Sequence, residues 1–568
     1  MKPNDPAWNS LVQAPRIVVD ADAETWDDDV DVVVVGFGGA GATTALKSAE
    51  AGLSVVALDK AEGGGATEAS GGVVYAGGGT RVQQEVGEED TPENMYAYLK
   101  LETGGVVSDE TLMRFCRESA ANLDWLMNRG VRFSGPVWKE KTSYPNVDYF
   151  LYHSDNSLLP EYKKHATPAA RGHRGVMRKG RSAVELGGSI YLPLKARCLE
   201  MGVVLKVKTD VDRLVLDERG RVVGVEALQL MPDSSAFTEH RECLRKGNRL
   251  TTLYPFFLPG ARSVHARARR YFERAREIEQ TQRLRIRIRA RRGVCLSAGG
   301  FIFNKAMVEH YCPAFAGGMP LGTPTDDGAG IRLGQSVGGS VAHMDRATAW
   351  RFINPPLAWS QGIIVDRRGR RFVNESCYGA TIGDAMVNQA DGRGWLLIDN
   401  GLVKSAWKQI WPTKVLPFQW QLGALNMLFG KQKYRDQAHL CEGLGFDPVV
   451  LEETLNEVAK CAEMGVQDRF GKPVGDLRKL EFPLHAIDVS LAARLLPCTV
   501  LTMGGLRVNE ATGEVVGQEN VPVAGLYAAG RSAVGLPSHL YMSGLSIADC
   551  VFSGLRAAGH MANQESGA

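Results

Sequence analysis

Residues 29–60 read DVDVVVVGFGGAGATTALKSAEAGLSVVALDK, and this stretch decides the fold. Its run of four valines predicts a buried strand, and the residues after the glycines have the apolar spacing of an amphipathic helix. A second strand follows at LSVVALD. Gly36, Gly38 and Gly41 match the G-x-G-x-x-G spacing, and the strand and helix that give this motif its meaning stand on either side of it.

The glycine motif predicts a dinucleotide-binding unit. The first glycine permits a tight turn, the second lets the backbone approach a pyrophosphate, and the third lets the helix pack closely on the strand. The helix N-terminus then offers free N–H groups to the diphosphate. Asp59 ends the second strand, where an acid accepts hydrogen bonds from a ribose. The motif alone leaves NAD and FAD open.

Length and composition narrow the class of protein. A chain of 568 residues is too long for one ordinary core, which favours two domains. The net charge of +2 gives no reason to expect a nucleic-acid partner. Its ten cysteines form no Cys-x-x-Cys, so no haem attachment, metal site or thioredoxin motif is predicted. The absence of a signal sequence and of any run of about 18 apolar residues predicts a cytoplasmic protein with no membrane span.

Three further segments resemble one family of flavoproteins. The loop 59–72, DKAEGGGATEASGG, is similar to the second glycine segment of the fumarate reductase, succinate dehydrogenase and 3-ketosteroid dehydrogenase superfamily. Residues 291–304, RRGVCLSAGGFIFN, resemble its returning strand, and residues 523–535, VAGLYAAGRSAVG, its closing strand and loop. The resemblance implies an α/β fold. A Rossmann-like FAD-binding domain is assembled from both ends of the chain, and an α+β substrate domain is inserted in it.

The same resemblance implies a division of the chain and a cofactor. We expect an N-terminal extension at 1–27, the first part of the FAD domain at 28–340 with a basic insertion at about 232–292, a substrate domain at 341–490, and the rest of the FAD domain at 491–568. The second glycine loop lacks the histidine of the covalent branch, so FAD is expected to be non-covalent. The residues expected to bind it are Gly36, Gly38, Gly39, Ala40, Gly41, Asp59, Lys60, Gly65, Ala66, Thr67, Ser70, Gly71, Gly72, Asp327, Gly530, Arg531, Ser546 and Ile547.

Residues 538–550, SHLYMSGLSIADC, carry the strongest indication of the chemistry. They fall where fumarate reductases have a catalytic arginine, and Tyr541 takes its place. A dicarboxylate needs fixed cations to offset its desolvation, and this segment supplies none. The pattern Tyr-x-Ser-Gly-x-Ser instead resembles the 3-oxo-5α-steroid 4-dehydrogenases, which introduce the C4–C5 double bond of a 3-ketosteroid. Met542, Ser543 and Leu545 break the Pro-Gly-Pro-Gly type run of the steroid 1-dehydrogenases.

The resemblance also implies catalytic roles. Ser543 takes the C4 proton with help from Tyr541, and a second tyrosine comes from the substrate domain. We assign it to Tyr378, in residues 362–379, GIIVDRRGRRFVNESCYG, where Asn374 and Glu375 are expected to be structural. Two alternatives stay open: Tyr378 is merely packed, or a tyrosine from the group 144, 149 and 152 replaces it.

The function and the partners have alternatives as well. These are a 3-ketosteroid 1-dehydrogenase, an enone or fumarate-type reductase, and a non-catalytic FAD-binding protein. The electron acceptor is not identified. The insertion joins an apolar segment, LTTLYPFFLPG at 250–260, to an arginine-rich one at 261–292. It is either a solvated excursion or a site of peripheral contact with an anionic membrane, through which a sterol enters.

Overall fold

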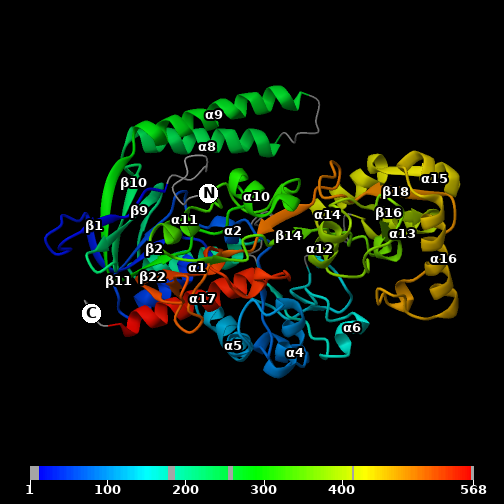
Figure 1. Cartoon of the computed structure of the whole chain (residues 1–568), viewed down its shortest axis with the longest axis horizontal. Helices are drawn as coiled ribbons and strands as arrows, with labels where there is room; N and C mark the ends of the chain where they lie inside the picture. The colour runs from blue at the N-terminus through cyan, green and yellow to red at the C-terminus, as the bar shows by residue number, and fades with distance from the viewer. Residues whose placement is uncertain (1–11, 147, 177–185, 254–259, 412–414, 565–568) are drawn as a thin grey trace.

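The glycine motif lies at the centre of a large sheet in the computed structural model (Figure 1). Strand β2 (Asp28–Val35) leads into helix α1 (Gly39–Glu50), and β3 (Val55–Leu58) returns parallel to β2. The valines of β2 at 32–35 are at most 5% exposed. The predicted α/β class is confirmed. The structure describes residues 12–146, 148–176, 186–253, 260–411 and 415–564.

Both ends of the chain contribute to this sheet. Strand β11 (Leu284–Leu296) lies parallel to β2 on one side, and β22 (Pro522–Ala528) lies parallel to the end of β11. The C-terminal helix α17 (Leu545–Asn563) then packs against α1. Blue and red segments therefore meet in Figure 1, as a dinucleotide domain built from distant parts of the chain requires.

The basic insertion is a helical hairpin followed by strand. Helices α8 (Ser235–Leu253) and α9 (Ala261–Thr281) pack together above the sheet (Figure 1). The alternating run RLRIRIR is not part of an excursion, because it forms the first half of the central strand β11. Ile286 and Ile288 are buried on one side of that strand, which the period of two explains.

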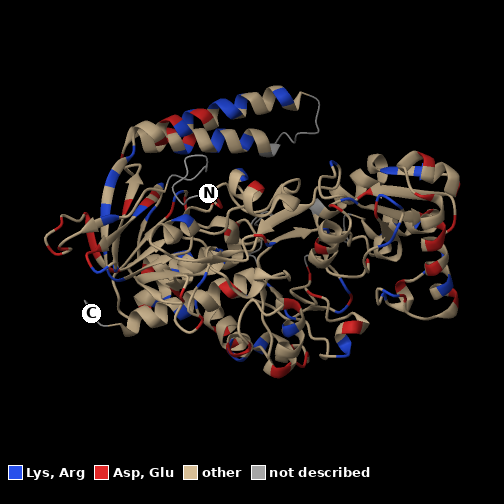
Figure 2. Ribbon diagram, in the orientation of Figure 1, with Lys and Arg blue, Asp and Glu red and all other residues tan. Residues whose placement is uncertain are grey.

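The arginines of β11 have acidic partners within the chain. Arg285 and Arg287 both contact Glu226, at 3.2 Å each, and Glu226 is only 2% exposed. Arg291 contacts Asp29 at 3.0 Å. Figure 2 shows blue and red side by side along this strand and its neighbours. This half of the arginine-rich segment therefore serves the fold and is not an uncompensated basic patch.

A second body lies on the other side of the molecule. Its core is a four-stranded antiparallel sheet, and a smaller sheet joins it to the first body. The four-stranded sheet comprises β15 (Ile363–Val365), β16 (Trp395–Asp399), β18 (Leu484–Asp488) and β17 (Lys431–Tyr434). The smaller sheet comprises β12 (Met319–Pro320), β19 (Thr499–Thr502) and β14 (Ala347–Trp350). The predicted domain boundaries at 340 and 490 stay predictions.

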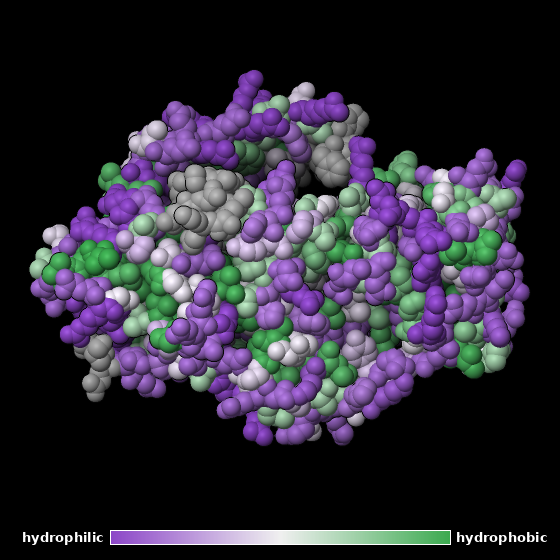
Figure 3. All heavy atoms as spheres, viewed as in Figure 1, coloured by the Kyte–Doolittle hydropathy of each residue, from purple (hydrophilic) through white to green (hydrophobic). Residues whose placement is uncertain are grey.

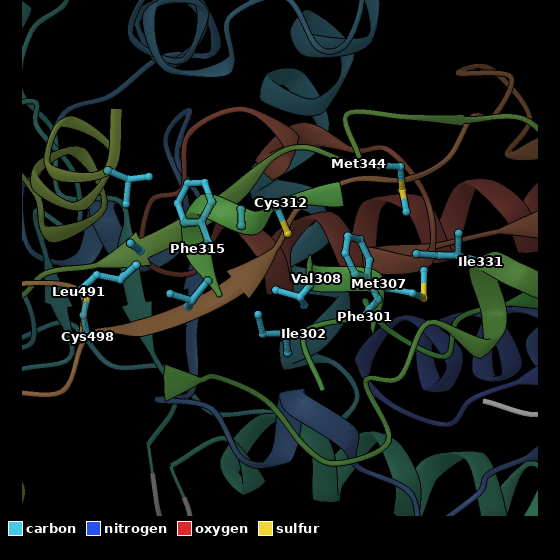
Figure 4. Packing of buried hydrophobic residues seen from close by; sticks show 14 of the residues in the cluster. Phe301, Ile302, Met307, Val308, Cys312, Phe315, Ile331, Met344, Leu491 and Cys498 are labelled. Carbon is cyan, nitrogen blue, oxygen red and sulfur yellow. The ribbon is translucent and has the colours of Figure 1, made fainter. Parts of the chain in front are cut away.

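The two bodies share a hydrophobic core. Figure 4 shows part of it, where Phe301 and Met307 from the first body lie in the same cluster as Leu491 and Cys498 from the second. Burial of apolar side chains in a shared core stabilises the contact between the two bodies. In the part of the chain that the structure describes, no helix is long and apolar enough to cross a membrane.

Candidate active site

A cavity of about 700 Å³ lies between the two bodies. Its walls come from the β2–α1 turn, the second glycine loop, the 297–299 turn, the start of α17 and several apolar residues of the second body. Segments more than 500 residues apart in sequence therefore enclose one space. A volume in this range suits a substantial organic ligand rather than an ion.

The β2–α1 turn has the geometry that a phosphate-binding loop needs. Gly36 has a φ of +93°, and a Cβ on Gly41 would lie 2.0 Å from the carbonyl oxygen of Gly36. The N-cap of α1, Gly38, has no capping side chain, and the N–H of Gly39 donates to Oγ1 of Thr67 over 3.1 Å. Gly38, Gly39 and Ala40 line the cavity. The turn therefore requires glycine and brings the N-terminus of the helix to the cavity.

Asp59 has a structural task that the sequence did not indicate. Its Oδ2 accepts a hydrogen bond from the backbone N–H of Phe37 over 2.8 Å, and its Oδ1 accepts from those of Ala61 and Gly63 over 2.8 and 3.1 Å. The carboxylate thereby joins the first glycine turn to the second glycine loop. Asp59 also lines the cavity, where remaining lone pairs can accept hydrogen bonds from a ribose.

Arg531 supports the fit of a phosphate-bearing cofactor. Its side chain is 10% exposed, and one terminal nitrogen contacts Asp326 at 2.8 Å. The other terminal nitrogen is buried and has no hydrogen-bond partner among the described residues. A buried guanidinium donor without a partner is costly, and a ligand oxygen would satisfy it. Arg531 lines the cavity, so the structure offers both amide and guanidinium donors to a diphosphate.

Most of the residues expected to bind FAD share this cavity. Gly41 and Gly72 do not line it, since Gly41 packs against the turn and a Cβ on Gly72 would lie 2.1 Å from the carbonyl oxygen of Leu186. Residues that the sequence did not indicate, Asp210 and Asp326 among them, line it too. The cavity wall includes these residues of the expected set: Gly36, Gly38, Gly39, Ala40, Asp59, Lys60, Gly65, Ala66, Thr67, Ser70, Gly71, Asp327, Gly530, Arg531, Ser546 and Ile547.

Ser543 lies at the start of α17, where its backbone is held from the other side of the cavity. Its N–H donates to the carbonyl oxygen of Ser154 over 3.2 Å, and the Ser154 hydroxyl donates to the Ser543 carbonyl over 3.1 Å. The next residue, Gly544, has a φ of +90°, and a Cβ there would lie 2.6 Å from the backbone nitrogen of Tyr75. The turn that presents Ser543 therefore depends on that glycine.

Tyr152, one of the tyrosines that the sequence left open as alternatives to Tyr378, is in contact with Ser543. Its hydroxyl donates a hydrogen bond to Oγ of Ser543 over 3.0 Å. Of the other tyrosines considered, Tyr144 donates to the carbonyl oxygen of Gly71 over 2.5 Å, and Tyr149 packs on Trp138 with ring centroids 4.9 Å apart. Burial raises the pKa of Tyr152 above its usual value, so it remains a phenol at neutral pH.

Tyr541 faces the cavity from the segment before α17. Its ring lies on Trp350, with centroids 4.6 Å apart at an angle of 38°, and only 7% of the residue is exposed. Burial raises its pKa, although the backbone N–H of Gly544 lowers it. Tyr541 therefore presents a neutral hydroxyl, which is able to donate a hydrogen bond to a carbonyl oxygen.

Tyr378 lies behind this group and is not part of the cavity wall. It is 3% exposed, and its backbone N–H donates to Oδ1 of Asn156 over 2.6 Å. Its hydroxyl is buried and has no hydrogen-bond partner among the described residues. Burial raises its pKa, Tyr152 and Tyr541 raise it further, and the nearby Ser543 hydroxyl lowers it. The three tyrosines and Ser543 thus form one cluster.

The part of the cavity beyond this cluster is apolar. Trp350, Phe352, Trp359, Leu422 and Leu501 line it. Among the described residues of the wall, Lys60 and Arg531 supply the only lysine and arginine, and both lie at the glycine-loop end. A dicarboxylate would find no paired cation beside Tyr541 and Ser543, whereas a large hydrocarbon with one ketone would be well accommodated. The described residues also hold no group of three potential metal ligands.

Comparison with known proteins agrees with this geometry. Residues 31–546 match the family model described as FAD binding domain. The chain is 37% identical over 526 residues to 3-oxo-5-alpha-steroid 4-dehydrogenase of Comamonas testosteroni, an alignment that covers 90% of this chain and 94% of that protein. It is 24% identical to 3-oxosteroid 1-dehydrogenase of Mycolicibacterium smegmatis, over 90% of this chain and 93% of that protein.

A solved structure shows the same architecture. The crystal structure of 3-ketosteroid-delta4-(5alpha)-dehydrogenase from Rhodococcus jostii RHA1, in complex with 4-androstene-3,17-dione, superimposes with a TM-score of 0.79 at 28% identity. The match covers 97% of this chain and 100% of that one. The match therefore extends over both bodies.

Proposed function

Because the chain belongs to the FAD binding domain family, together with the 3-oxo-5-alpha-steroid 4-dehydrogenase of Comamonas testosteroni, we propose that it is a flavin-dependent dehydrogenase that introduces the C4–C5 double bond of a 3-ketosteroid. The chain binds FAD, which we propose is held without a covalent bond. The observation that carries the substrate class is the cluster of Ser543 and neutral tyrosines beside the apolar part of the cavity wall, to which the described residues contribute no lysine or arginine.

The residues divide the chemistry as follows. FAD, when bound, supplies the oxidant that accepts the C5 hydrogen as hydride. Tyr541 donates its hydroxyl proton in a hydrogen bond to the C3 ketone oxygen, which acidifies the C4 hydrogens and stabilises enolate character. Ser543 Oγ takes the C4 proton. Neutral hydroxyls suit this role, since a charged base beside a hydrocarbon would cost several kcal/mol of desolvation.

Tyr152 and Tyr378 complete the path of the proton in this proposal. Tyr152 donates to Ser543 Oγ and so fixes the direction of the remaining Ser543 lone pair. As Ser543 Oγ gains the C4 proton, it passes its own hydroxyl proton to the oxygen of Tyr378, whose hydroxyl has no partner among the described residues. Tyr378 releases its own hydroxyl proton towards solvent, so each oxygen gains one proton and loses one. Hydrogen-bonded hydroxyls move a proton in this way without any group carrying a full charge for long.

One observation favours a second candidate. Tyr152 comes from the N-terminal half of the chain, as a catalytic tyrosine does in the steroid 1-dehydrogenases that the sequence resembles, and it touches Ser543. A 1-dehydrogenase would remove hydrogens at C1 and C2 instead. The position of the ketone relative to Tyr541 decides between the two outcomes, and product mass alone does not, because both reactions remove two hydrogens.

A steroid assay tests the proposal. Anaerobic addition of a 5α-3-ketosteroid is expected to bleach the flavin absorbance in a stoichiometric amount, with a 4-ene-3-ketosteroid as product, identified by its ultraviolet absorbance and by chromatography against standards. The same steroid with the 3-ketone reduced to an alcohol serves as the control and should leave the flavin oxidised. If neither a 5α-3-ketosteroid nor a 4-ene-3-ketosteroid perturbs the flavin, the substrate assignment is wrong.

We also propose that the α8–α9 hairpin contacts an anionic membrane surface. The described surface of the hairpin is hydrophilic, as the purple atoms over α8 and α9 show (Figure 3). Arg262, Arg267 and Arg270 on α9 are exposed and make no ion pair among the described residues. The apolar tip predicted for membrane contact falls largely on residues 254–259, which lie outside the described residues. Anionic headgroups would complement the arginines.

Deletion of residues 250–260 is therefore expected to abolish co-sedimentation with vesicles that contain anionic lipid. The physical reason is the loss of the apolar residues next to a basic surface, since either signal alone binds weakly. Neutral vesicles provide the control for charge, and flavin content checks that the deleted protein is folded. Unchanged binding to anionic vesicles would rule out contact through this tip.

A further inference from the structure

The base of the α8–α9 hairpin is linked to the glycine-loop end of the cavity. Strand β11 begins directly after α9, and β10 (Val222–Gln229) lies between it and β9 (Thr209–Asp217) in the sheet. Strand β9 contributes Thr209, Asp210 and Val211 to the cavity wall. Lys60 and Asp327 lie on the same part of the wall. Figure 1 shows the hairpin above this side of the sheet. The hairpin is thus continuous with the glycine-loop end of the site and remote from the tyrosine cluster.

A chain of alternating charges connects the two. Lys60 Nζ lies 2.8 Å from a carboxylate oxygen of Asp327 and 3.4 Å from one of Asp210. Arg283 contacts the same oxygen of Asp210 at 3.3 Å and reaches Glu279, near the end of α9, at 3.4 Å. The other oxygen of Glu279 lies 2.7 Å from Nε2 of His240 on α8.

The ion pairs in this chain of charges are largely buried, so solvent screens them little. Side-chain exposure is 9% for Asp327, 15% for Asp210 and 9% for Arg283. Burial alone would lower the pKa of the Lys60 ammonium, but Asp210 and Asp327 raise it above its usual value. Lys60 therefore stays charged between two carboxylates. A buried carboxylate that loses one of its cations is strongly destabilised, so each link depends on the next.

Arg283 determines how much negative charge remains beside the cofactor. With Arg283 present, Asp210 and Asp327 are balanced by two cations, Lys60 and Arg283. Without it, two carboxylates share one lysine at the end of a cavity that must also accept a diphosphate. The extra negative charge would repel the cofactor and would draw Lys60 away from it.

We propose that the α8–α9 hairpin is a cofactor-retention element, in which Glu279 and Arg283 hold Asp210 and Lys60 in place at the end of the FAD site. Glu279 and Arg283 are positioning residues, because they act on the cofactor through Asp210 and Lys60. Packing of the hairpin and binding of FAD then stabilise each other by the same free energy, as linkage requires. This inference concerns cofactor binding alone, so it stands or falls independently of the steroid chemistry.

The first test measures FAD affinity. The apoprotein is prepared by removing FAD from the holoenzyme and is titrated with FAD by quenching of flavin fluorescence. Arg283→Gln is expected to raise the dissociation constant about tenfold or more, and Glu279→Gln by a smaller factor, because Glu279 is more exposed. Arg283→Lys should recover part of the affinity, since it restores the charge. The steroid KM of the FAD-saturated variants should stay unchanged.

Arg274→Gln is the matched control. Arg274 joins α9 to Glu239 of α8 at 2.8 Å on the exposed face and has no contact with the charge chain. The Arg274→Gln substitution removes a contact between the two helices of the hairpin and leaves the cavity wall unchanged. FAD affinity should therefore remain at the wild-type value. If Arg274→Gln weakens FAD as much as Glu279→Gln does, general loosening explains the effect and the proposal fails.

The second test follows the hairpin itself. Trypsin cleaves at exposed arginines of α9, and added FAD is expected to slow this cleavage at least threefold in the wild-type apoprotein and in Arg274→Gln. In Glu279→Gln and Arg283→Gln, FAD should have little effect on the rate. If FAD leaves wild-type cleavage unchanged, or if Glu279→Gln is protected as well as the wild type, the hairpin is not coupled to the cofactor.

Discussion

Ser543→Ala is expected to lower kcat for 3-ketosteroid oxidation by about 10²–10⁴-fold, the range in which loss of a positioned acid or base usually falls. Ser543 Oγ accepts a hydrogen bond from Tyr152 over 3.0 Å, and its hydroxyl lies near that of Tyr378. Alanine removes the proton acceptor without changing the backbone contacts to Ser154, which involve only main-chain atoms of Ser543. FAD content and steroid affinity should therefore remain close to the wild-type values.

Stopped-flow measurement of flavin reduction is the appropriate assay, because it isolates the chemical step from reoxidation. Tyr152→Phe should slow this step less than Ser543→Ala, since it removes only the orienting bond. Tyr144→Phe provides the matched control, because the Tyr144 hydroxyl contacts a backbone carbonyl and not Ser543. If Ser543→Ala reduces its flavin at the wild-type rate while Tyr541→Phe does not, the proton goes to Tyr541 and the assignment is wrong.

Glu375→Ala is expected to destabilise the protein by about 3–5 kcal/mol, the usual cost of leaving buried cations without their partner. The Glu375 side chain is 0% exposed, and its oxygens accept from Arg371 over 2.8 and 2.7 Å and from Lys472 over 3.0 Å. A further bond comes from the backbone N–H of Ile364 over 2.8 Å. Burial alone would raise the pKa of Glu375, but Arg371 and Lys472 lower it, so it is charged at neutral pH.

The midpoint of unfolding in urea measures this effect, with FAD present at saturation for all variants. Arg367→Ala removes the cation from an ion pair with Asp391, within the same segment 362–379 as Glu375, but both side chains of this pair are largely exposed. Solvent screens such pairs, so this control should unfold at the wild-type midpoint. An unchanged midpoint for Glu375→Ala would contradict the expectation that the ion cluster of Glu375, Arg371 and Lys472 stabilises the segment 362–379, which ends just after Tyr378.

Local sequence patterns made the dinucleotide-binding unit predictable. Four valines, three spaced glycines and an amphipathic segment specify strand, turn and helix within a few residues of one another, and the structure has these elements. The run RLRIRIR at 283–289 has the alternation that is typical of a strand, and it forms the first half of β11. Its place in the central sheet was missed, because the acidic partners of its arginines lie on β-strands and loops distant in sequence.

The site was predictable only where one segment carried it. Tyr541 and Ser543 are two residues apart, so a motif could indicate both, and their roles remain predictions. Tyr152 was one of several tyrosines with equal standing, since nothing near it in sequence points to Ser543. Asp210 lies on β9, between β1 and β10, and its place beside Lys60 depends on the packing of that strand against the second glycine loop.

The sequence by itself thus determined the dinucleotide motif and the α/β class. It could do so because strand and helix periodicities, and the need for glycine at a tight turn, are properties of neighbouring residues. Only the tertiary structure decided that Tyr152 meets Ser543 across 391 residues and that a hairpin insertion is linked to the cofactor end of the cavity. Such contacts arise from packing of surfaces, and no local rule in the chain encodes which hydroxyl or carboxylate will arrive there.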